Sequence, residues 1–157
     1  MSAGADLNVR GARPGDADMI GRLLHEFNDE YGEPTPGPRA LAKRARGLLE
    51  RGEVSVLLAG AAPDGLAVLR FSAAIWTGSL ECLLAELYVA PARRGSGLGR
   101  ALMGAAIDLA RLEGSNHMYL GTSEDDVAAR RLYESLGFSN RQGGAHGPIN
   151  YLYQLDL

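Results

Sequence analysis

The sequence holds only one cysteine, Cys82, among its 157 residues. A single thiol excludes an internal disulfide bond and a zinc site built from several cysteines. The apolar neighbours Leu83 and Leu84 predict that Cys82 is a small core residue of a strand rather than a nucleophile. The sequence therefore predicts no metal site.

Long apolar runs and clusters of basic residues are also lacking. No segment reaches the roughly 18 consecutive apolar residues of a membrane helix, and residues 1–18 lack the apolar stretch of a signal peptide. The net charge of −3 leaves no basic surface field of the kind that binds nucleic acid. We therefore expect a cytoplasmic protein with no membrane partner and no nucleic-acid partner.

The apolar fraction of 46% is typical of a globular protein, and the length suits one domain with its own core. We interpret residues 1–157 as that single domain. Hydrophobic periodicity and turn residues predict the element order β-α-α-β-β-β-α-β-α-β-β. Strands are expected over residues 7–12, 54–59, 66–76, 80–89, 117–121 and 149–157, and helices from Asp16 to about Gly32, from the proline-rich segment 34–38 to Gly52, and over 97–113 and 124–136.

The most informative segment joins a predicted strand to the alanine-rich helix that follows it. Gly95, Gly97 and Gly99 alternate there and are followed by Arg100. The dinucleotide-binding pattern G-x-G-x-x-G needs a glycine at position 100, and a P-loop needs a lysine followed by serine or threonine, so neither pattern fits. The pattern that fits is Arg94-x-x-Gly97-x-Gly99, where free backbone N–H groups and a helix N-terminus favour a phosphate or pyrophosphate.

A second motif lies downstream in residues 128–138, which read A-x-x-x-Y-x-x-x-G-F. The two motifs, in this order, resemble the GNAT superfamily of acetyl-CoA-dependent N-acetyltransferases. The resemblance covers residues 93–138 specifically. It implies a GNAT-like mixed α/β fold of the α+β type, in which a central twisted, mostly antiparallel sheet of about seven strands is flanked by about four helices.

The resemblance also implies where acetyl-CoA binds. Its pyrophosphate is expected on the backbone N–H groups between Arg94 and Gly99, where a Cβ atom would block a close approach. Backbone groups of the preceding strand are expected to bind the pantetheine arm and to polarise the thioester carbonyl. A glycine-rich turn without a ligand is the alternative for the loop. The residues assigned to acetyl-CoA are Leu87, Tyr88, Val89, Arg94, Gly95, Ser96, Gly97, Leu98, Gly99 and Arg100.

Glu86 is the candidate general base. Strict alternation along residues 80–89 places Cys82, Leu84, Glu86 and Tyr88 on one face of the strand. A carboxylate in the middle of a central strand is costly unless it is hydrated or paired, and some GNAT members use a glutamate from this strand as the base. An ion pair between Glu86 and an arginine is the alternative.

Tyr133 is the candidate general acid, because it matches the family tyrosine that protonates the departing thiolate. Helical spacing places Ala128, Leu132 and Leu136 on the core stripe, with Tyr133 beside it. An ordinary packed tyrosine is the alternative. Many family members carry an asparagine seven residues before this tyrosine, and here the residue is Asp126, which we interpret first as a carboxylate at a helix N-terminus.

Glu30 and Glu33 precede the second helix, a connection that usually forms one wall of the acceptor site in GNAT proteins. An acidic wall would attract a cationic amine, whereas a solvated helix end is the alternative. We expect direct attack on acetyl-CoA by a small-molecule primary amine in a ternary complex. Acetylation of a protein N-terminal or lysine amine, and acyl-CoA sensing without catalysis, stay open. The alternating segment 149–157 also leaves a homodimer open.

Overall fold

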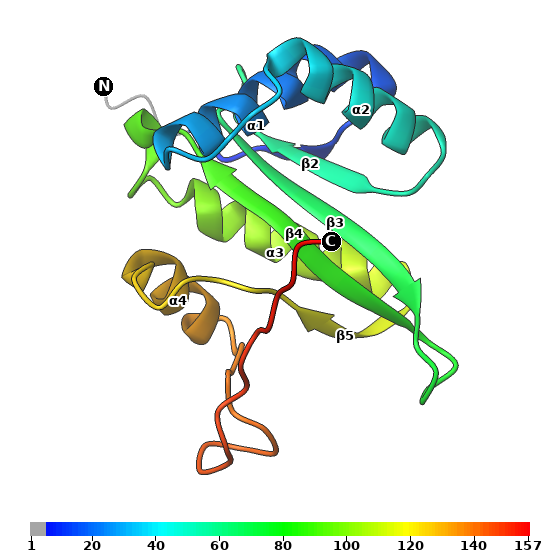
Figure 1. Ribbon diagram of the computed structural model, residues 1–157, viewed down its shortest axis with the longest axis vertical. Helices are drawn as coiled ribbons and strands as arrows, with labels where there is room; N and C mark the ends of the chain where they lie inside the picture. Colours follow the sequence, from blue (N-terminus) through cyan, green and yellow to red (C-terminus); the bar gives the residue numbers. More distant parts are fainter. Residues whose placement is uncertain (1–5) are drawn as a thin grey trace. The chain divides into compact units, whose positions relative to one another are not determined.

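The computed structural model describes residues 6–157 (Figure 1). The chain divides into two compact units, Met1–Met118 and Tyr119–Leu157. The first unit contains β1 (Val9–Gly11), α1 (Ala17–Glu30), α2 (Pro38–Glu50), β2 (Ser55–Ala59), β3 (Gly65–Ala73), β4 (Leu80–Val89), α3 (Leu98–Leu112) and β5 (Ser115–Tyr119), whose last residue begins the second unit. The second unit contains α4 (Val127–Ser135).

The five strands form one sheet in the order β1-β2-β3-β4-β5. The strands from β1 to β4 pair antiparallel with their neighbours. Strand β5 follows β4 through the crossover helix α3, which is the connection that joins parallel neighbours. The sheet is therefore mixed rather than mostly antiparallel, and within residues 6–157 it has five strands rather than about seven.

The strand expected over residues 149–157 is wrong. In the second unit this segment makes one isolated bridge, between Arg141 and Ile149, and residues 150–157 are exposed and irregular. Alternating apolar residues fit a strand, but a strand forms only where a neighbouring edge accepts and donates its backbone hydrogen bonds. The sequence pattern carries no information about that edge.

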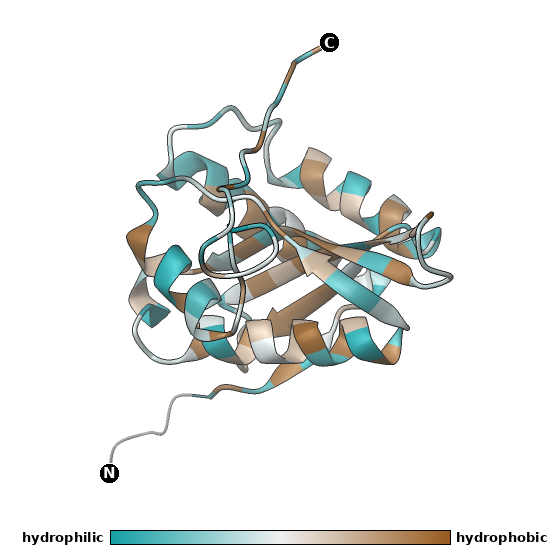
Figure 2. Cartoon of the chain, turned by 90° about the horizontal axis from the view of Figure 1, so that it is seen from below, coloured by the Kyte–Doolittle hydropathy of each residue, from teal (hydrophilic) through white to brown (hydrophobic). Residues whose placement is uncertain are grey.

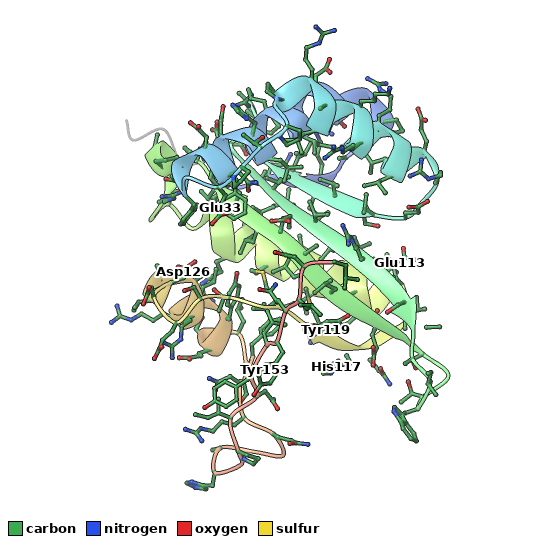
Figure 3. The ribbon with its side chains drawn as sticks, viewed as in Figure 1. Glu33, Glu113, His117, Tyr119, Asp126 and Tyr153 are labelled. Atoms are coloured by element: carbon green, nitrogen blue, oxygen red, sulfur yellow. The ribbon has the colours of Figure 1, made fainter. Side chains whose placement is uncertain are left out.

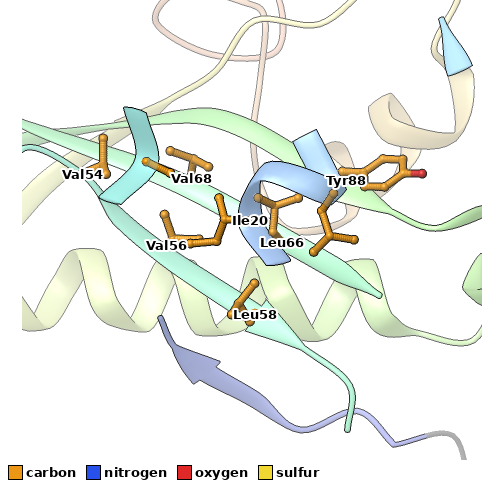
Figure 4. Packing of buried hydrophobic residues seen from close by; sticks show 9 residues of the cluster. Ile20, Val54, Val56, Leu58, Leu66, Val68 and Tyr88 are labelled. Carbon is orange, nitrogen blue, oxygen red and sulfur yellow. The ribbon is translucent and has the colours of Figure 1, made fainter. Parts of the chain in front are cut away.

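Helices α1 and α2 cover one face of the sheet and α3 covers the other (Figure 1). Figure 2 shows apolar residues along the central strands, and alternating apolar and polar residues along the helices. On α1, Ile20 and Leu23 are buried in one cluster with the sheet residues Val56, Leu58 and Leu66, and Figure 4 shows Ile20 among them. This amphipathic spacing is the reason that the helix forms where periodicity predicts it.

The close packing of α1 against α2 depends on Gly21. A Cβ atom at this position would lie 2.7 Å from the backbone nitrogen of Ala42 and closer still to the carbonyl oxygen of Pro38. Such distances are below van der Waals contact, so only glycine lets the two backbones approach this closely. The α1–α2 pair then presents a single apolar surface to the sheet, and it fixes where the C-terminal end of α1 lies.

Candidate active site

The loop between β4 and α3 has the backbone that the glycine pattern predicts. A short 3-10 turn, Pro91–Arg93, leaves β4, and Gly97 is the N-cap residue of α3. Gly95 has a φ angle of 75° and Gly97 one of 90°, a left-handed region that L side chains rarely adopt. The first N–H groups of α3 have no carbonyl one turn earlier to bond with, so they are available at this end of the helix.

Side chains brace the loop from within. The Arg93 guanidinium forms an ion pair with Asp64, with 2.9 Å between Nη1 and Oδ2. The hydroxyl of Ser96 donates to the Arg93 carbonyl oxygen at 2.5 Å. Ser96, assigned to the cofactor by sequence, therefore holds the loop through its side chain, and its backbone N–H also donates to the Arg93 carbonyl oxygen, at 3.4 Å. The sequence does not predict the ion pair of Arg93, because its partner Asp64 lies in a different turn and no local pattern relates the two residues.

Arg94 bridges the loop, the end of β4 and the end of α1. Its Nε atom donates to the Val89 carbonyl oxygen at 3.0 Å, and its Nη2 atom lies 2.5 Å from Glu30 Oε2. The centre of its guanidinium lies 6.0 Å from the centroid of the Tyr88 ring. Hydrogen bonding to Glu30 raises the pKa of Arg94. Arg94, which is predicted to bind the cofactor, thus directly contacts Glu30, which is predicted to bind the acceptor.

Strand β4 contains a bulge at Ala85. In the register with β3, Val68 pairs with Glu86 and Leu69 pairs with Leu84, so Ala85 stands opposite no residue of β3. Directly opposite residues share a face of the sheet, and successive residues alternate between faces. Because Val68 and Leu69 are successive, Glu86 and Leu84 lie on opposite faces.

The predicted alternation on this strand is therefore wrong. Cys82 and Leu84 share one face, whereas Glu86 and Tyr88 share the other, which packs against α1. One extra residue in a strand reverses the facing of every residue beyond it, and nothing in the local sequence announces a bulge. The consequence for the site is that the Glu86 carboxylate lies on the same face as the Tyr88 ring.

Glu86 is half-buried on that face. Burial raises the pKa of its carboxyl group, and the positive charge of Arg70 opposes part of this effect. Among the residues that the structure describes, Glu86 forms no ion pair, although the charge of Arg70 acts on its carboxylate. A raised pKa brings a carboxylate closer to the range in which a general base works.

Tyr88 is a buried residue, 4% exposed, whose ring is held from α1. Phe27 stacks on it with the ring centroids 5.2 Å apart, and Tyr31 meets Phe27 edge-on at 5.5 Å. Figure 4 shows the Tyr88 hydroxyl at the edge of the apolar cluster. Burial raises the pKa of this phenol, and the negative charges of Glu30 and Glu26 raise it further. The positive charges of Arg94 and Arg22 oppose this rise, so acidic and basic residues both lie near the edge of the cluster.

The connection from α1 to α2 is fixed by polar contacts that sequence reasoning did not assign. His25 Nδ1 lies 3.1 Å from the Thr35 hydroxyl, and Asn28 Nδ2 donates to the Pro34 carbonyl at 3.0 Å. Glu33, a predicted acceptor residue, lies in this connection just beyond α1 (Figure 3). The one signal that could have indicated these contacts is the group of polar residues that flanks the proline-rich segment.

The second unit carries Tyr133 on α4. Tyr133 is buried on this helix at 8% exposure, whereas the predicted stripe residues Leu132 and Leu136 are half-buried and Ala128 is exposed, so the predicted stripe is wrong at Ala128. Burial raises the pKa of Tyr133 to about 12, with a further contribution from the charge of Asp126. Asp126 accepts a hydrogen bond from the Ala129 backbone nitrogen at 3.1 Å, which confirms it as a carboxylate at the helix start (Figure 3).

Comparison with known proteins gives the family. The acetyltransferase (GNAT) family matches residues 22–138, which is most of the chain. The protein therefore belongs to the GNAT acetyltransferase family. The sequence resemblance is thereby confirmed, and the match runs through both the glycine loop and the α4 motif.

Individual relatives agree with the family. An uncharacterized N-acetyltransferase of Bacillus subtilis (strain 168), YhfO, is 29% identical, over 92% of this chain and 97% of its own. The crystal structure of a proposed acetyltransferase from Arthrobacter sp. FB24 is 42% identical, with a TM-score of 0.86, covering 94% of this chain and 95% of that one. An aminoglycoside acetyltransferase from an uncultured soil metagenomic sample, in complex with sisomicin, shares the fold at 14% identity, with a TM-score of 0.74 and coverage of 95% and 96%.

Two further observations concern residues 6–157. No helix within this range is both long and apolar enough to cross a membrane. Over the same range, no three or more histidine, cysteine, aspartate or glutamate side chains are grouped so that they could hold a metal ion.

Proposed function

We propose that the protein transfers the acetyl group of acetyl-CoA to the primary amine of a small molecule, by direct attack in a ternary complex. The observation that carries this proposal is the loop from Arg94 to Gly99, whose left-handed glycines open into α3 within the matched family region. The match also extends from the first compact unit into the second, which supports one N-acetyltransferase domain over residues 1–157.

The loop fits the pyrophosphate of coenzyme A. Gly95 and Gly97 present backbone without Cβ atoms, and the start of α3 adds N–H donors and the positive end of the helix dipole. Leu98, Gly99 and Arg100 form the first turn of that helix, whereas the Ser96 backbone N–H would have to leave the Arg93 carbonyl oxygen to bind a phosphate. When bound, acetyl-CoA supplies the activated thioester. The protein supplies position and charge.

Two side chains would move protons. Glu86, with its raised pKa, would take the proton of the incoming ammonium directly or through water. Tyr133 would donate its phenolic proton to the leaving thiolate, and its pKa of about 12 keeps that proton in place at neutral pH. Backbone groups of Leu87, Tyr88 and Val89 would bind the pantetheine arm and polarise the thioester carbonyl.

A small cationic amine suits the charge of the α1 end. Glu30 ends α1, where it pairs with Arg94, and Glu33 lies just beyond; an acidic segment of this kind raises the local concentration of cations. One protein of the same fold is an aminoglycoside acetyltransferase, and an aminoglycoside is a small molecule that carries amino groups. A protein N-terminal or lysine amine is the alternative acceptor, and it would need the site to admit a peptide backbone.

The test is to identify the acetylated product by mass spectrometry after incubation with acetyl-CoA and a panel of amines. The panel contains polyamines, aminoglycosides, amino acids, and short peptides with free N-terminal or lysine amines. We expect acetylation of a small cationic amine and little transfer to peptides. Transfer to peptides alone would show that the acceptor is a protein amine rather than a small molecule. Tight acetyl-CoA binding with no product across the panel would favour a non-catalytic sensor instead.

A further inference from the structure

The Arg94 guanidinium occupies a cation site made by three different groups. Glu30 supplies a carboxylate, the Val89 carbonyl oxygen accepts a hydrogen bond at 3.0 Å, and the Tyr88 ring lies 6.0 Å from the guanidinium centre. A carboxylate, a backbone carbonyl and an aromatic face are each attractive to a positively charged group. All these groups belong to the first compact unit.

This cation site is held firmly. Tyr88 is buried and stacked on Phe27, so its ring cannot turn away from the site. Val89 ends strand β4 opposite Gly65, which fixes where its backbone lies. Glu30 ends α1, a helix that packs on the sheet through Ile20 and Leu23. The receptor groups are thus set by the fold, whereas Arg94, the cation that they hold, comes from a loop.

The Arg94 guanidinium also lies in the loop that is proposed to bind the cofactor. Arg94 begins the R-x-x-G-x-G loop that is proposed to take the pyrophosphate of coenzyme A. A diphosphate carries more negative charge than one carboxylate, and guanidinium groups bind phosphate oxygens well. The Arg94–Glu30 pair is also partly exposed, at 44% and 28% for the two side chains, so the pair is weak enough to exchange.

We propose that pyrophosphate binding draws Arg94 away from Glu30, and that the vacated site of Glu30, the Tyr88 ring and the Val89 carbonyl then holds an ammonium group of the acceptor. This proposal rests on the proposed function. It narrows the substrate class, because an ammonium held by a carboxylate and a carbonyl keeps its proton, whereas the attacking amine must lose one. The acceptor therefore carries at least two amino groups.

The first test measures the affinity of coenzyme A itself by titration calorimetry. Glu30→Gln removes the competitor for Arg94, so we expect its coenzyme A affinity to rise about two- to fivefold over wild type. Asp29→Asn is the matched control, because it removes the same charge from an exposed position one residue away on α1. Equal affinities for the wild type and both variants overturn the exchange, as does a weaker affinity in Glu30→Gln.

The second test uses spermidine as the acceptor probe and propylamine as a probe with one amino group. Spermidine should bind the coenzyme A complex of the wild type more tightly than it binds the free protein, and Glu30→Gln should lose that difference. Propylamine should show no such difference in either protein. Spermidine affinity that is unchanged by coenzyme A overturns the proposal.

A third measurement needs no variant. The Arg94 Nε–H resonance, observed by NMR in the wild type, should shift when coenzyme A is added, because its bond to the Val89 carbonyl is broken. An unmoved resonance in the saturated complex overturns the exchange. These results are separable from the proposed function: a wild type that binds no coenzyme A contradicts that function, whereas a wild type that binds it without these effects contradicts only the exchange.

Discussion

At the scale of single residues, the protonation of Glu86 links activity to stability. Its carboxyl pKa is raised by burial, so the folded protein holds this proton more tightly than the unfolded chain does. At pH values above that raised pKa, folding must bury a charge, which costs free energy. The carboxylate that is proposed to act as the general base therefore destabilises the folded protein at neutral pH.

This link gives a prediction for Glu86→Gln. The variant should lose acetyl transfer by about a hundredfold or more, as expected for removal of a general base. It should also unfold at a higher temperature than wild type at pH 7, because the amide needs no buried charge. Because the charge of Glu86 is lost as the pH falls through its raised pKa, the difference in melting temperature should shrink at acidic pH. A less stable variant at pH 7 would contradict the assignment of a half-buried carboxylate that costs stability when it is charged.

Tyr133 is tested by Tyr133→Phe, which removes the phenolic oxygen and keeps the ring that lies 6.0 Å from Phe138. Turnover should fall by about a hundredfold or more while the affinity for acetyl-CoA stays that of the wild type. Steady-state rates with equilibrium binding to both proteins check this. Equal turnover numbers for wild type and Tyr133→Phe would show that Tyr133 is an ordinary packed side chain and not the general acid.

At the scale of elements, the junction between β1 and α1 rests on Asp16. Its carboxylate accepts hydrogen bonds from Arg10 at 2.8 Å and from the Arg13 backbone nitrogen at 2.8 Å. These bonds, that of Arg10 first, lower the pKa of Asp16 to about 2. A lowered pKa means that the stabilisation is present at neutral pH and is lost as the pH falls toward about 2.

Asp16→Asn should therefore lower the melting temperature at pH 7, and its difference from wild type should disappear as the pH approaches 2. Thermal unfolding followed by circular dichroism across this range measures it. Asp18→Asn, in the first turn of α1, is the control for loss of a carboxylate near the helix start. A difference that stays constant from pH 7 to low pH would show that the charge of Asp16 is not what stabilises the junction.

Local sequence patterns predict a helix, strand or loop well where its structure depends on its own residues alone. The bounds of β4 agree with those expected, and the glycine loop opens into α3 as the spacing indicates. Local patterns fail where the structure of a segment depends on its pairing with a second element. The bulge at Ala85 is a property of the register with β3, and residues 150–157 lack the paired neighbour that would make them a strand.

At the scale of the whole molecule, the candidate site depends on contacts between distant parts of the sequence. Arg94 and Glu30 lie 64 residues apart, and their ion pair follows from the packing of α1 on the sheet beside the end of β4. The R-x-x-G-x-G motif indicates Arg94 as a cofactor residue, and the acidic segment before the second helix indicates Glu30 as an acceptor residue. Their contact needed the fold, because no periodicity within one element relates them.

Every role proposed for this site depends on acetyl-CoA binding at the loop before α3, which is tested by the acetyl-CoA affinity of a loop variant. Gly97→Val places a β-branched residue at a φ of 90°, so it should weaken binding by about tenfold or more. Gly104→Ala, in open space on α3, is the control and should bind as wild type does. Wild-type affinity in a folded Gly97→Val protein would contradict acetyl-CoA binding at this loop.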